Sequence, residues 1–369
     1  MKLSCTQENL NQGLNIVGHL AIKNSNLPIL NNVLLKTQEG GLLLSATNLE
    51  IGINCKIRAK VENNGIFSVP ANLLSNFISL LNNEERVDVE LINKEIIIKS
   101  GPQETKIKGE DASEFPLIPE IKKENKNIVN SEELKKALSQ VVFAVSLDET
   151  RMEISGVLMS FSQKKLILAA TDSYRLAEKK LSLKEGDSNQ QIIIPQKTAQ
   201  EVLRILQALP TEEEVDIYIN DNQVLFIVNQ VELVSRLIEG NYPDYQQIIP
   251  QEHKTSVIVE IKDFIKIIKR AALFSKIGIN DVNLNFDEEK QVITVKSANN
   301  QLGENTSEVS AAIKGGGNNI VFNYRYLLDG LNNLEKEKAV IKIIDNSNPG
   351  LFCGEGVEDY LYLIMPIRQ

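Results

Sequence analysis

The residue types that most often hold metals or act in catalysis are few and far apart in this sequence of 369 residues. The two histidines, His19 and His253, have no partner at the spacing of a metal-ligand motif. The three cysteines, Cys5, Cys55 and Cys353, form no C-x-x-C pair, and their odd number argues against a disulfide framework. We therefore expect no metal, no cofactor and reduced thiols.

Two further patterns resemble catalytic motifs but are incomplete. The run Gly315-Gly316-Gly317-Asn318 lacks the G-K-[ST] of a phosphate-binding loop and favours a loop between strands. Asp148-Glu149, beside Thr150-Arg151, is more typical of solvated charge than of a catalytic carboxylate pair. Because no nucleophile motif is present either, the sequence favours a protein that is not an enzyme. An enzyme built from three repeated domains is the main alternative class.

The chemistry that the sequence does offer is positive charge along predicted helices. Such a surface would contact nucleic acid phosphates, which follow a duplex at about one charge per 1.7 Å. Ordinary solvated helix faces are the alternative. The net charge of −9 and the pI of about 5.1, taken alone, also oppose nucleic acid binding. Residues 7–20 and 71–81 contribute no Lys or Arg. The basic residues on the other helix faces are Lys135, Lys136, Lys197, Arg204, Lys262, Lys266, Lys269, Arg270 and Arg325.

The chain that must position these side chains repeats one phrase three times. Aligning Ala46, Ala170 and Ala298 gives separations of 170 − 46 = 124 and 298 − 170 = 128 residues. Self-similarity at this distance indicates tandem copies of a domain-sized unit rather than a solenoid. The three copies of the phrase are Leu42–Asn54, Leu166–Glu178 and, more divergent, Ile293–Asn305.

Each copy predicts two amphipathic helices and about eight strands, an α+β fold with the helices on one sheet face. In the last copy, Phe264, Ile267 and Ile268 form the apolar stripe of such a helix. In the middle copy, we expect Ser131 to be the N-cap of the first helix. The predicted domains are residues 1–126, 127–253 and 254–369.

The composition is that of an ordinary soluble globular protein, with 42% hydrophobic and 24% charged residues. No apolar run approaches the roughly 20 residues that cross a bilayer. The start, MKLSCTQENL, has no apolar signal-peptide core. We therefore expect a cytoplasmic protein that makes no membrane contact.

Four phrases follow one another along the chain: Leu27-Pro-Ile-Leu30, Ala170-Thr-Asp-Ser-Tyr-Arg-Leu-Ala177, Tyr242-Pro-Asp-Tyr245 and Met365-Pro-Ile-Arg368. Together with the threefold repeat, they resemble the bacterial sliding clamps, the beta subunit of DNA polymerase III. The resemblance implies a head-to-tail homodimer, a six-domain ring whose helices line a hole around double-stranded DNA of any sequence. It also implies a processivity factor that tethers the DNA polymerase III alpha subunit, the clamp loader and other proteins with clamp-binding motifs.

A ring-shaped assembly would explain how a chain with a net negative charge can act on DNA. If topology holds the ring on DNA, a few basic groups inside can guide the duplex while the acidic exterior repels other DNA. The resemblance adds Lys23 to the DNA-facing residues, whereas Asn24 and Asn72 stand where some relatives have arginines. At the dimer interface it places Leu273 and Phe274 of one subunit against the strand near Ile107 of the other. A repeat scaffold that binds only proteins is the second alternative.

The resemblance also implies a peptide groove between the second and third copies. Partners would dock there through a glutamine followed by aliphatic and aromatic residues, and apolar walls with few polar anchors suit a peptide. For any single residue of the set, ordinary core packing is an equal alternative. Tyr174, Ser173 and Gln247 stand where the family usually has histidine, glycine and often a basic residue. The implied groove residues are Ile154, Thr171, Tyr174, Arg175, Leu176, Pro243, Ile248, Leu363, Met365, Pro366, Ile367 and Arg368.

Overall fold

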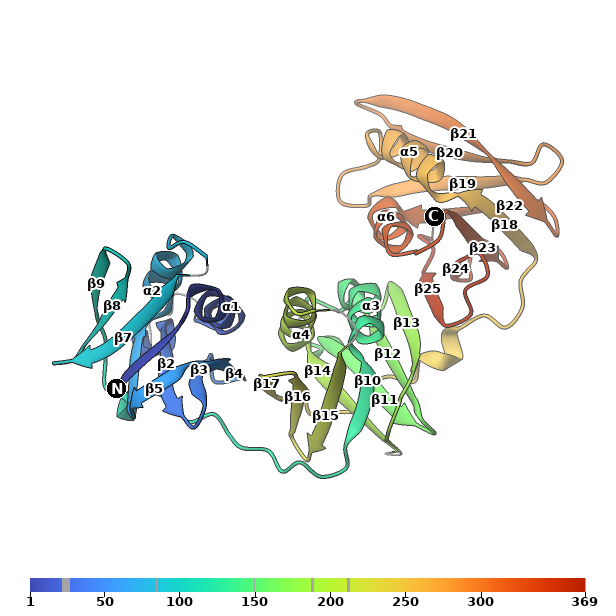
Figure 1. Ribbon diagram of the computed structural model, residues 1–369. Helices are drawn as coiled ribbons and strands as arrows, with labels where there is room; N and C mark the ends of the chain where they lie inside the picture. The colour runs from blue at the N-terminus through green and yellow to red at the C-terminus, as the bar shows by residue number, and fades with distance from the viewer. Residues whose placement is uncertain (22–26, 84, 149, 187–188, 211–212, 369) are drawn as a thin grey trace. The chain divides into compact units, whose positions relative to one another are not determined.

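The computed structural model describes residues 1–21, 27–83, 85–148, 150–186, 189–210 and 213–368 (Figure 1). The chain divides into two compact units, and the middle third of the sequence contributes to both. Among the described residues, no helix is long and apolar enough to cross a membrane. Unit 1 comprises Met1–Glu132, Leu183–Ser188 and Glu201–Leu237, and unit 2 comprises Glu133–Ser182, Asn189–Gln200 and Ile238–Gln369.

Unit 1 contains two antiparallel sheets, of five strands in the order β5-β1-β7-β8-β9 and of eight in the order β10-β15-β16-β17-β4-β3-β2-β6. Its helices are α1 (Gln7–Val17) and α2 (Ala71–Ser79). The strands are β1 (Lys2–Thr6), β2 (Asn32–Gln38), β3 (Gly41–Thr47), β4 (Ile51–Arg58), β5 (Lys60–Asn63), β6 (Ile66–Pro70), β7 (Arg86–Ile92), β8 (Glu95–Ser100), β9 (Gln103–Lys108), β10 (Asn127–Asn130), β15 (Glu214–Asn220), β16 (Gln223–Val228) and β17 (Val231–Arg236).

Unit 2 is built on one twelve-stranded antiparallel sheet in the order β14-β11-β12-β13-β25-β24-β23-β18-β21-β20-β19-β22. Helices α5 (Ile261–Ala272) and α6 (Tyr324–Asn332) belong to it, whereas α3 (Ser131–Val141) and α4 (Gln196–Ala208) have residues in both units. The strands are β11 (Gly156–Ser162), β12 (Lys165–Thr171), β13 (Arg175–Ser182), β14 (Gln190–Pro195), β18 (Thr255–Glu260), β19 (Asp281–Asp287), β20 (Val292–Asn299), β21 (Gly303–Lys314), β22 (Asn318–Asn323), β23 (Lys338–Ile343), β24 (Gly350–Gly354) and β25 (Tyr360–Ile364).

Helix α5 shows how the hydrophobic pattern positions an element. Phe264 and Ile268 are fully buried and Ile267 is 5% exposed, as the apolar stripe predicts. The N-cap prediction for α3 was wrong by one residue. Asn130 caps this helix by accepting from the Glu132 N–H at 2.9 Å. Ser131 begins the helix, and its Oγ accepts instead from the Glu213 N–H at 3.2 Å.

The first copy of the repeated phrase forms a tight turn between β3 and β4. The Asn48 side-chain oxygen accepts from the N–H groups of Glu50 and Ile51 at 3.0 and 2.7 Å. The Thr47 hydroxyl donates to the Ile51 carbonyl at 2.9 Å and accepts from the Leu49 N–H at 3.0 Å. These bonds hold Leu49 at φ 76°, a left-handed conformation that costs a non-glycine residue about 1 kcal/mol or more.

The second copy reproduces the same turn between β12 and β13. The Asp172 carboxylate accepts from the N–H groups of Tyr174 and Arg175, both at 3.0 Å. The Thr171 hydroxyl donates to the Arg175 carbonyl at 2.7 Å and accepts from the Ser173 N–H at 3.1 Å. Ser173 lies at φ 76°, like its counterpart in the first turn. The repeat seen in the sequence is therefore a repeated hydrogen-bonding unit: short polar side chains bond the backbone and tolerate the turn.

Each of these turns leads into a strand that pairs with a later part of the chain. Strand β4 pairs with β17, and we call this pairing the first joint. Strand β13 pairs with β25, and we call this pairing the second joint. An equivalent backbone hydrogen bond lies next to each joint. The Arg236 N–H donates to the Glu50 carbonyl at 3.1 Å, and the Met365 N–H donates to the Tyr174 carbonyl at 2.8 Å.

The third copy leads into β21, whose first half lies at an open edge. Here Asn299 accepts from the Gln301 N–H at 2.9 Å, and the left-handed residue is Gly303. Among the described strands, residues 303–310 of β21 pair only with β20, since β18 begins its pairing at Ala311. In unit 1, β9 is the last strand of the five-stranded sheet. Each unit thus presents a strand edge that a further strand could extend.

Candidate partner groove, basic helices and sheet edges

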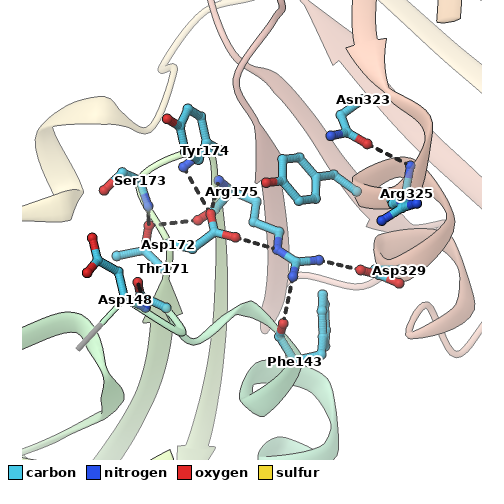
Figure 2. A network of polar contacts seen from close by, with 12 residues as sticks. Phe143, Asp148, Thr171, Asp172, Ser173, Tyr174, Arg175, Asn323, Arg325 and Asp329 are labelled. Atoms are coloured by element: carbon cyan, nitrogen blue, oxygen red, sulfur yellow. Dashed lines mark hydrogen bonds and ion pairs between the residues drawn. The ribbon is translucent and has the colours of Figure 1, made fainter. Parts of the chain in front are cut away.

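Arg175 anchors the turn of the second copy to the last third of the chain (Figure 2). Its Nε donates to the Asp172 carboxylate at 3.0 Å, one terminal nitrogen to Asp329 at 2.5 Å, and the other to the Phe143 carbonyl at 2.9 Å. The guanidinium carbon lies 4.6 Å from the centre of the Tyr326 ring, within cation–π range. With only 12% of its side chain exposed, Arg175 holds strand β13 against helix α6.

The surroundings of Arg175 keep it charged. Burial opposes the charge, but Tyr362 and the carboxylates of Asp329 and Asp172 together raise the pKa of Arg175 above its ordinary value. Asp172 is itself 15% exposed, so the pair is largely removed from water. Arginine suits this position because its planar fork bonds two carboxylates and stacks on a ring at once. Arg175, a member of the predicted groove, is therefore fully engaged by contacts within unit 2.

The C-terminal tail folds back beside this turn. Beyond the Met365 bond to Tyr174, the Ile367 N–H donates to the Val321 carbonyl at 2.8 Å. Met365, Pro366 and Ile367 are half-buried along this path, and Arg368 is exposed. These two backbone bonds, one to the turn and one to β22, fix the course of the tail.

The remaining predicted groove residues separate into a buried set and an exposed set. Ile154, Leu176 and Leu363 are each 1% exposed. Leu176 and Leu363 belong to a core cluster with Tyr245, which also contains Leu158 and Ala169. Tyr174 is 62% and Ile248 45% exposed and Pro243 is exposed, whereas Thr171 is buried within the turn. Tyr174 stacks on Tyr326, with ring centres 6.4 Å apart.

Sequence reasoning missed a buried polar pair that includes Tyr245 of this cluster. The Tyr245 hydroxyl donates to the Glu178 carboxylate at 2.6 Å, and both side chains are buried. Burial, followed by the hydrogen bond to Glu178, raises the pKa of Tyr245 above its ordinary value. The signal available was Tyr245 in the Tyr242-Pro-Asp-Tyr phrase, whose partner 67 residues earlier is visible only in the fold.

The basic residues predicted to face DNA differ in their surroundings. Lys262, Lys269 and Arg270 are exposed on α5, opposite its buried stripe. Lys266 is exposed there too and pairs with Asp263 at 2.9 Å. Lys197 is exposed on α4. On α3, Lys136 pairs with Glu335 and Lys135 is half-buried. Lys23 lies outside the described residues.

Arg204 is bound inside unit 1 rather than extended into solvent. Its guanidinium pairs with Glu201 at 2.5 Å and donates to the carbonyls of Asn15 and Ile16, at 3.1 and 2.5 Å. These carbonyls lie in the last turn of α1, where cations are favourable. His19 Nδ1 lies 2.9 Å from the other Glu201 oxygen. Arg204 and Glu201 therefore link α4 to the C-terminal end of α1.

The three residues implied at a dimer interface lie at these open strand edges or beside them. Ile107 is in the edge strand β9, and its side chain points into the core at 3% exposure. Leu273 follows α5 and is 72% exposed. Phe274 lies against Gly303 at the start of β21. Ile277 and Leu302, 93% and 60% exposed, add to the apolar surface of unit 2.

Repeated α+β modules joined edge to edge through their sheets, with basic helices and a C-terminal tail beside a surface turn, are the features of a DNA sliding clamp. Within the described residues, no group of three or more His, Cys, Asp or Glu side chains could hold a metal ion. Family models of the DNA polymerase III beta subunit match the chain along its length. They are the N-terminal domain at residues 1–119, the central domain at 128–244 and the C-terminal domain at 246–368.

Individual relatives agree with these matches. The beta sliding clamp of Staphylococcus aureus is 30% identical over 354 residues, covering 93% of this chain and 92% of that protein. The crystal structure of the DNA polymerase sliding clamp from Bacillus subtilis superposes with a TM-score of 0.93 at 31% identity, over 100% of this chain and 99% of that one. The sliding clamp from Pseudomonas aeruginosa, at 24% identity, shares the fold with a TM-score of 0.95 over 100% of both chains.

The chain belongs to the bacterial beta sliding clamps, the beta subunit of DNA polymerase III. Its function is that of a DNA sliding clamp, an accessory subunit of the polymerase without catalytic activity of its own.

Proposed function

We propose that two copies of this chain close a six-domain ring around duplex DNA in the cytoplasm. Each chain contributes domains 1–126, 127–253 and 254–369. The observation that carries the proposal is the pair of joints, because among the described strands the three copies of the turn-and-strand unit lead to only two joints within one chain. Strand β21 follows the third copy of the turn as β4 and β13 follow the first two. Its partner would be β9 of a second chain.

Charge and burial support this head-to-tail pairing. The open half of β21 carries Glu304 and Glu308, whereas β9 carries Lys106 and Lys108. Opposite charges on paired strands stabilise a sheet, and pairing would cover two exposed edges that otherwise invite aggregation. The exposed Leu273 would be covered by the same contact. In such a head-to-tail interface, each chain contributes one of the two edges at each contact. Two copies therefore close the ring if each copy spans half of it.

The ring needs only sequence-independent contacts to DNA. We propose that Lys197 on α4 and the exposed face of α5 contribute the strongest positive charge, supplemented by Lys135, Lys136 and Lys23. Such lysines act on phosphates and carry no base specificity. Arg204 also belongs to the predicted surface. Its bonds to α1 suggest that it positions this helix more than it reaches for phosphate.

We propose further that the surface between Tyr174, Ile248 and the tail residues Met365–Arg368 is a groove for partner peptides. The support is its make-up: a buried apolar floor, exposed apolar groups at the rim, and a backbone fixed by the Arg175 network. Peptide sites combine these features. The partners would be the DNA polymerase III alpha subunit, the clamp loader and other proteins with a glutamine-aliphatic-aromatic motif. Tyr174 would form one wall by its stacking on Tyr326.

The groove is tested by truncating the tail and measuring the affinity of a Gln-Leu-x-Leu-Phe peptide by calorimetry. Deleting residues 363–369 removes one wall, and Met365→Ala removes a single side chain with little effect on folding. A buried aliphatic anchor is worth about 1.5–3 kcal/mol, so the deletion should weaken binding at least tenfold, equivalent to about 1.4 kcal/mol. Unchanged affinity in both folded variants would place the partner site elsewhere.

A further inference from the structure

A hollow lies in unit 1, on the sheet face that the helices leave uncovered. Gly13 of α1 packs against Leu44 and Ile57, so their sequence neighbours Leu43 and Lys56 point to the opposite face. Over that face, the segment 112–121 runs beside β2, β3, β4, β16 and β17 and encloses a hollow of about 600 Å³. This volume is within the range of roughly 300–1,000 Å³ typical of ligand sites.

The residues that cover the first joint differ from those that cover the second. At the second joint, the ring of Tyr245 packs with Leu176, Ala169 and Leu363 and fills the sheet face. In the repeat alignment, Gly52 takes the place of Leu176 (52 + 124 = 176). The covering residue there is Ile118, whose side chain lies 2.7 Å from where a Gly52 Cβ would stand. Ile118 therefore fills the space beside Gly52, and the hollow lies elsewhere on this face, along Leu43, Lys36 and Lys56.

Two lysines line the wall of this hollow. Lys36 of β2 and Lys56 of β4 flank Leu43 of β3 in register, and neither forms an ion pair with any residue that the structure describes. Of the two carboxylates in the lining, Glu232 is held by Lys123 at 2.8 Å, and Glu120 is exposed. In a chain of net charge −9, two such cations beside an apolar surface are complementary to an acidic ligand.

We infer that this hollow is a second docking site, which takes an extended acidic–aliphatic segment of a partner protein. Aliphatic side chains enter between Leu43 and Ile118, and flanking carboxylates reach Lys36 and Lys56. These two lysines are two strand spacings apart, about 10 Å. Successive side chains of an extended peptide point to opposite faces, so two carboxylates that flank an aliphatic residue on the same face are four residues apart, about 13 Å, and the flexible lysine side chains span the difference. The matching ligand pattern is Asp-aliphatic-aliphatic-aliphatic-Asp, unlike the glutamine-containing motif proposed for unit 2.

The test uses the full chain and a fluorescent, end-blocked Gly-Asp-Leu-Leu-Leu-Asp-Gly peptide, with binding followed by anisotropy. We expect saturable binding that weakens at least tenfold in the double variant Lys36→Glu/Lys56→Glu and weakens as salt is raised. The matched control Lys165→Glu/Lys314→Glu makes the same charge change on exposed lysines of unit 2 and should bind like the wild type. The peptide Gly-Lys-Leu-Leu-Leu-Lys-Gly should not bind.

Absence of saturable binding, equal binding of the lysine peptide, or equal affinity in Lys36→Glu/Lys56→Glu would each overturn the inference. If charge reversal unfolds the protein, Lys36→Gln/Lys56→Gln replaces it, and the affinity must still fall. Met365→Ala should leave this peptide's affinity unchanged while weakening the glutamine-motif peptide. The proposal of this second site and the proposal of the groove in unit 2 can therefore be refuted independently of each other.

Discussion

Replacing Arg175 with alanine should loosen unit 2 while leaving unit 1 intact. The change removes the partner of Asp172, which is 15% exposed, and three further contacts to Asp329, Phe143 and Tyr326. Removing one member of a buried ion pair costs about 3–5 kcal/mol. Because the Asp329 side chain is 47% exposed, solvent already screens part of the attraction. We therefore expect a loss at the lower end, about 3 kcal/mol.

Hydrogen exchange with mass spectrometry can assign this loss to a region, which a single unfolding curve cannot do for a chain of several domains. In Arg175→Ala, amides of β13 and α6 should exchange roughly 100-fold faster, since about 1.36 kcal/mol corresponds to a factor of ten. Amides of α1 and β3 in unit 1 serve as the internal control. Asp329→Asn should cost at most about 1 kcal/mol, because it removes only the exposed half of the network.

Two results would refute this reasoning. If exchange in β13 and α6 is unchanged, the contacts of Arg175 contribute nothing to holding these elements together. If exchange rises equally in unit 1, the effect is global and not that of a local anchor. Arg175→Lys separates charge from shape. It keeps the cation but loses the fork and the ring stacking, so its exchange should lie between wild type and alanine.

The interface, the helix lysines and a buried thiol each give a further prediction. Leu273→Ala/Phe274→Ala should yield monomers by light scattering, and a wild-type monomer at micromolar concentration would contradict the dimer. Lys197→Glu/Lys266→Glu should reduce loading and retention on circular DNA at low salt without changing the dimer; equal retention would mean that these lysines are only solvated. Burial raises the pKa of Cys5 to about 12, so iodoacetamide at pH 8 should label it far more slowly than in urea. Because the pKa of the Cys5 thiol is higher in the folded state, burial of this thiol contributes fully to the free energy of unfolding below the thiol pKa of the unfolded chain, about 8.5. This contribution declines as the pH rises toward 12.

The fold was largely predictable because its signals are local. The buried stripe of Phe264, Ile267 and Ile268 follows from the helical period alone. The repeated phrase predicted repeated structure because Thr47 and Thr171 begin the same turn. The cap of α3 was misplaced because Asn130 and Ser131 are both good caps, and only the backbone path decides between them.

The site was harder to predict from the sequence than the fold, because its contacts join residues far apart in the sequence. Nothing local to Arg175 indicates that Asp329 will meet it across 154 residues. The same holds for Arg204, which was predicted to face DNA from a helix, whereas its guanidinium donates to two α1 carbonyls that lie 188 and 189 residues earlier in the sequence. Periodicity assigns a face to a side chain. It does not identify the partner on that face, which depends on tertiary packing.

The most direct test of the account is whether the protein is held on DNA by topology. Loaded onto nicked circular duplex with its clamp loader, the protein should stay bound through gel filtration at moderate salt. It should then leave when a restriction enzyme linearises the circle, because it can slide off an end. Retention on the linear product, or loss from the closed circle at the same rate, would contradict the ring.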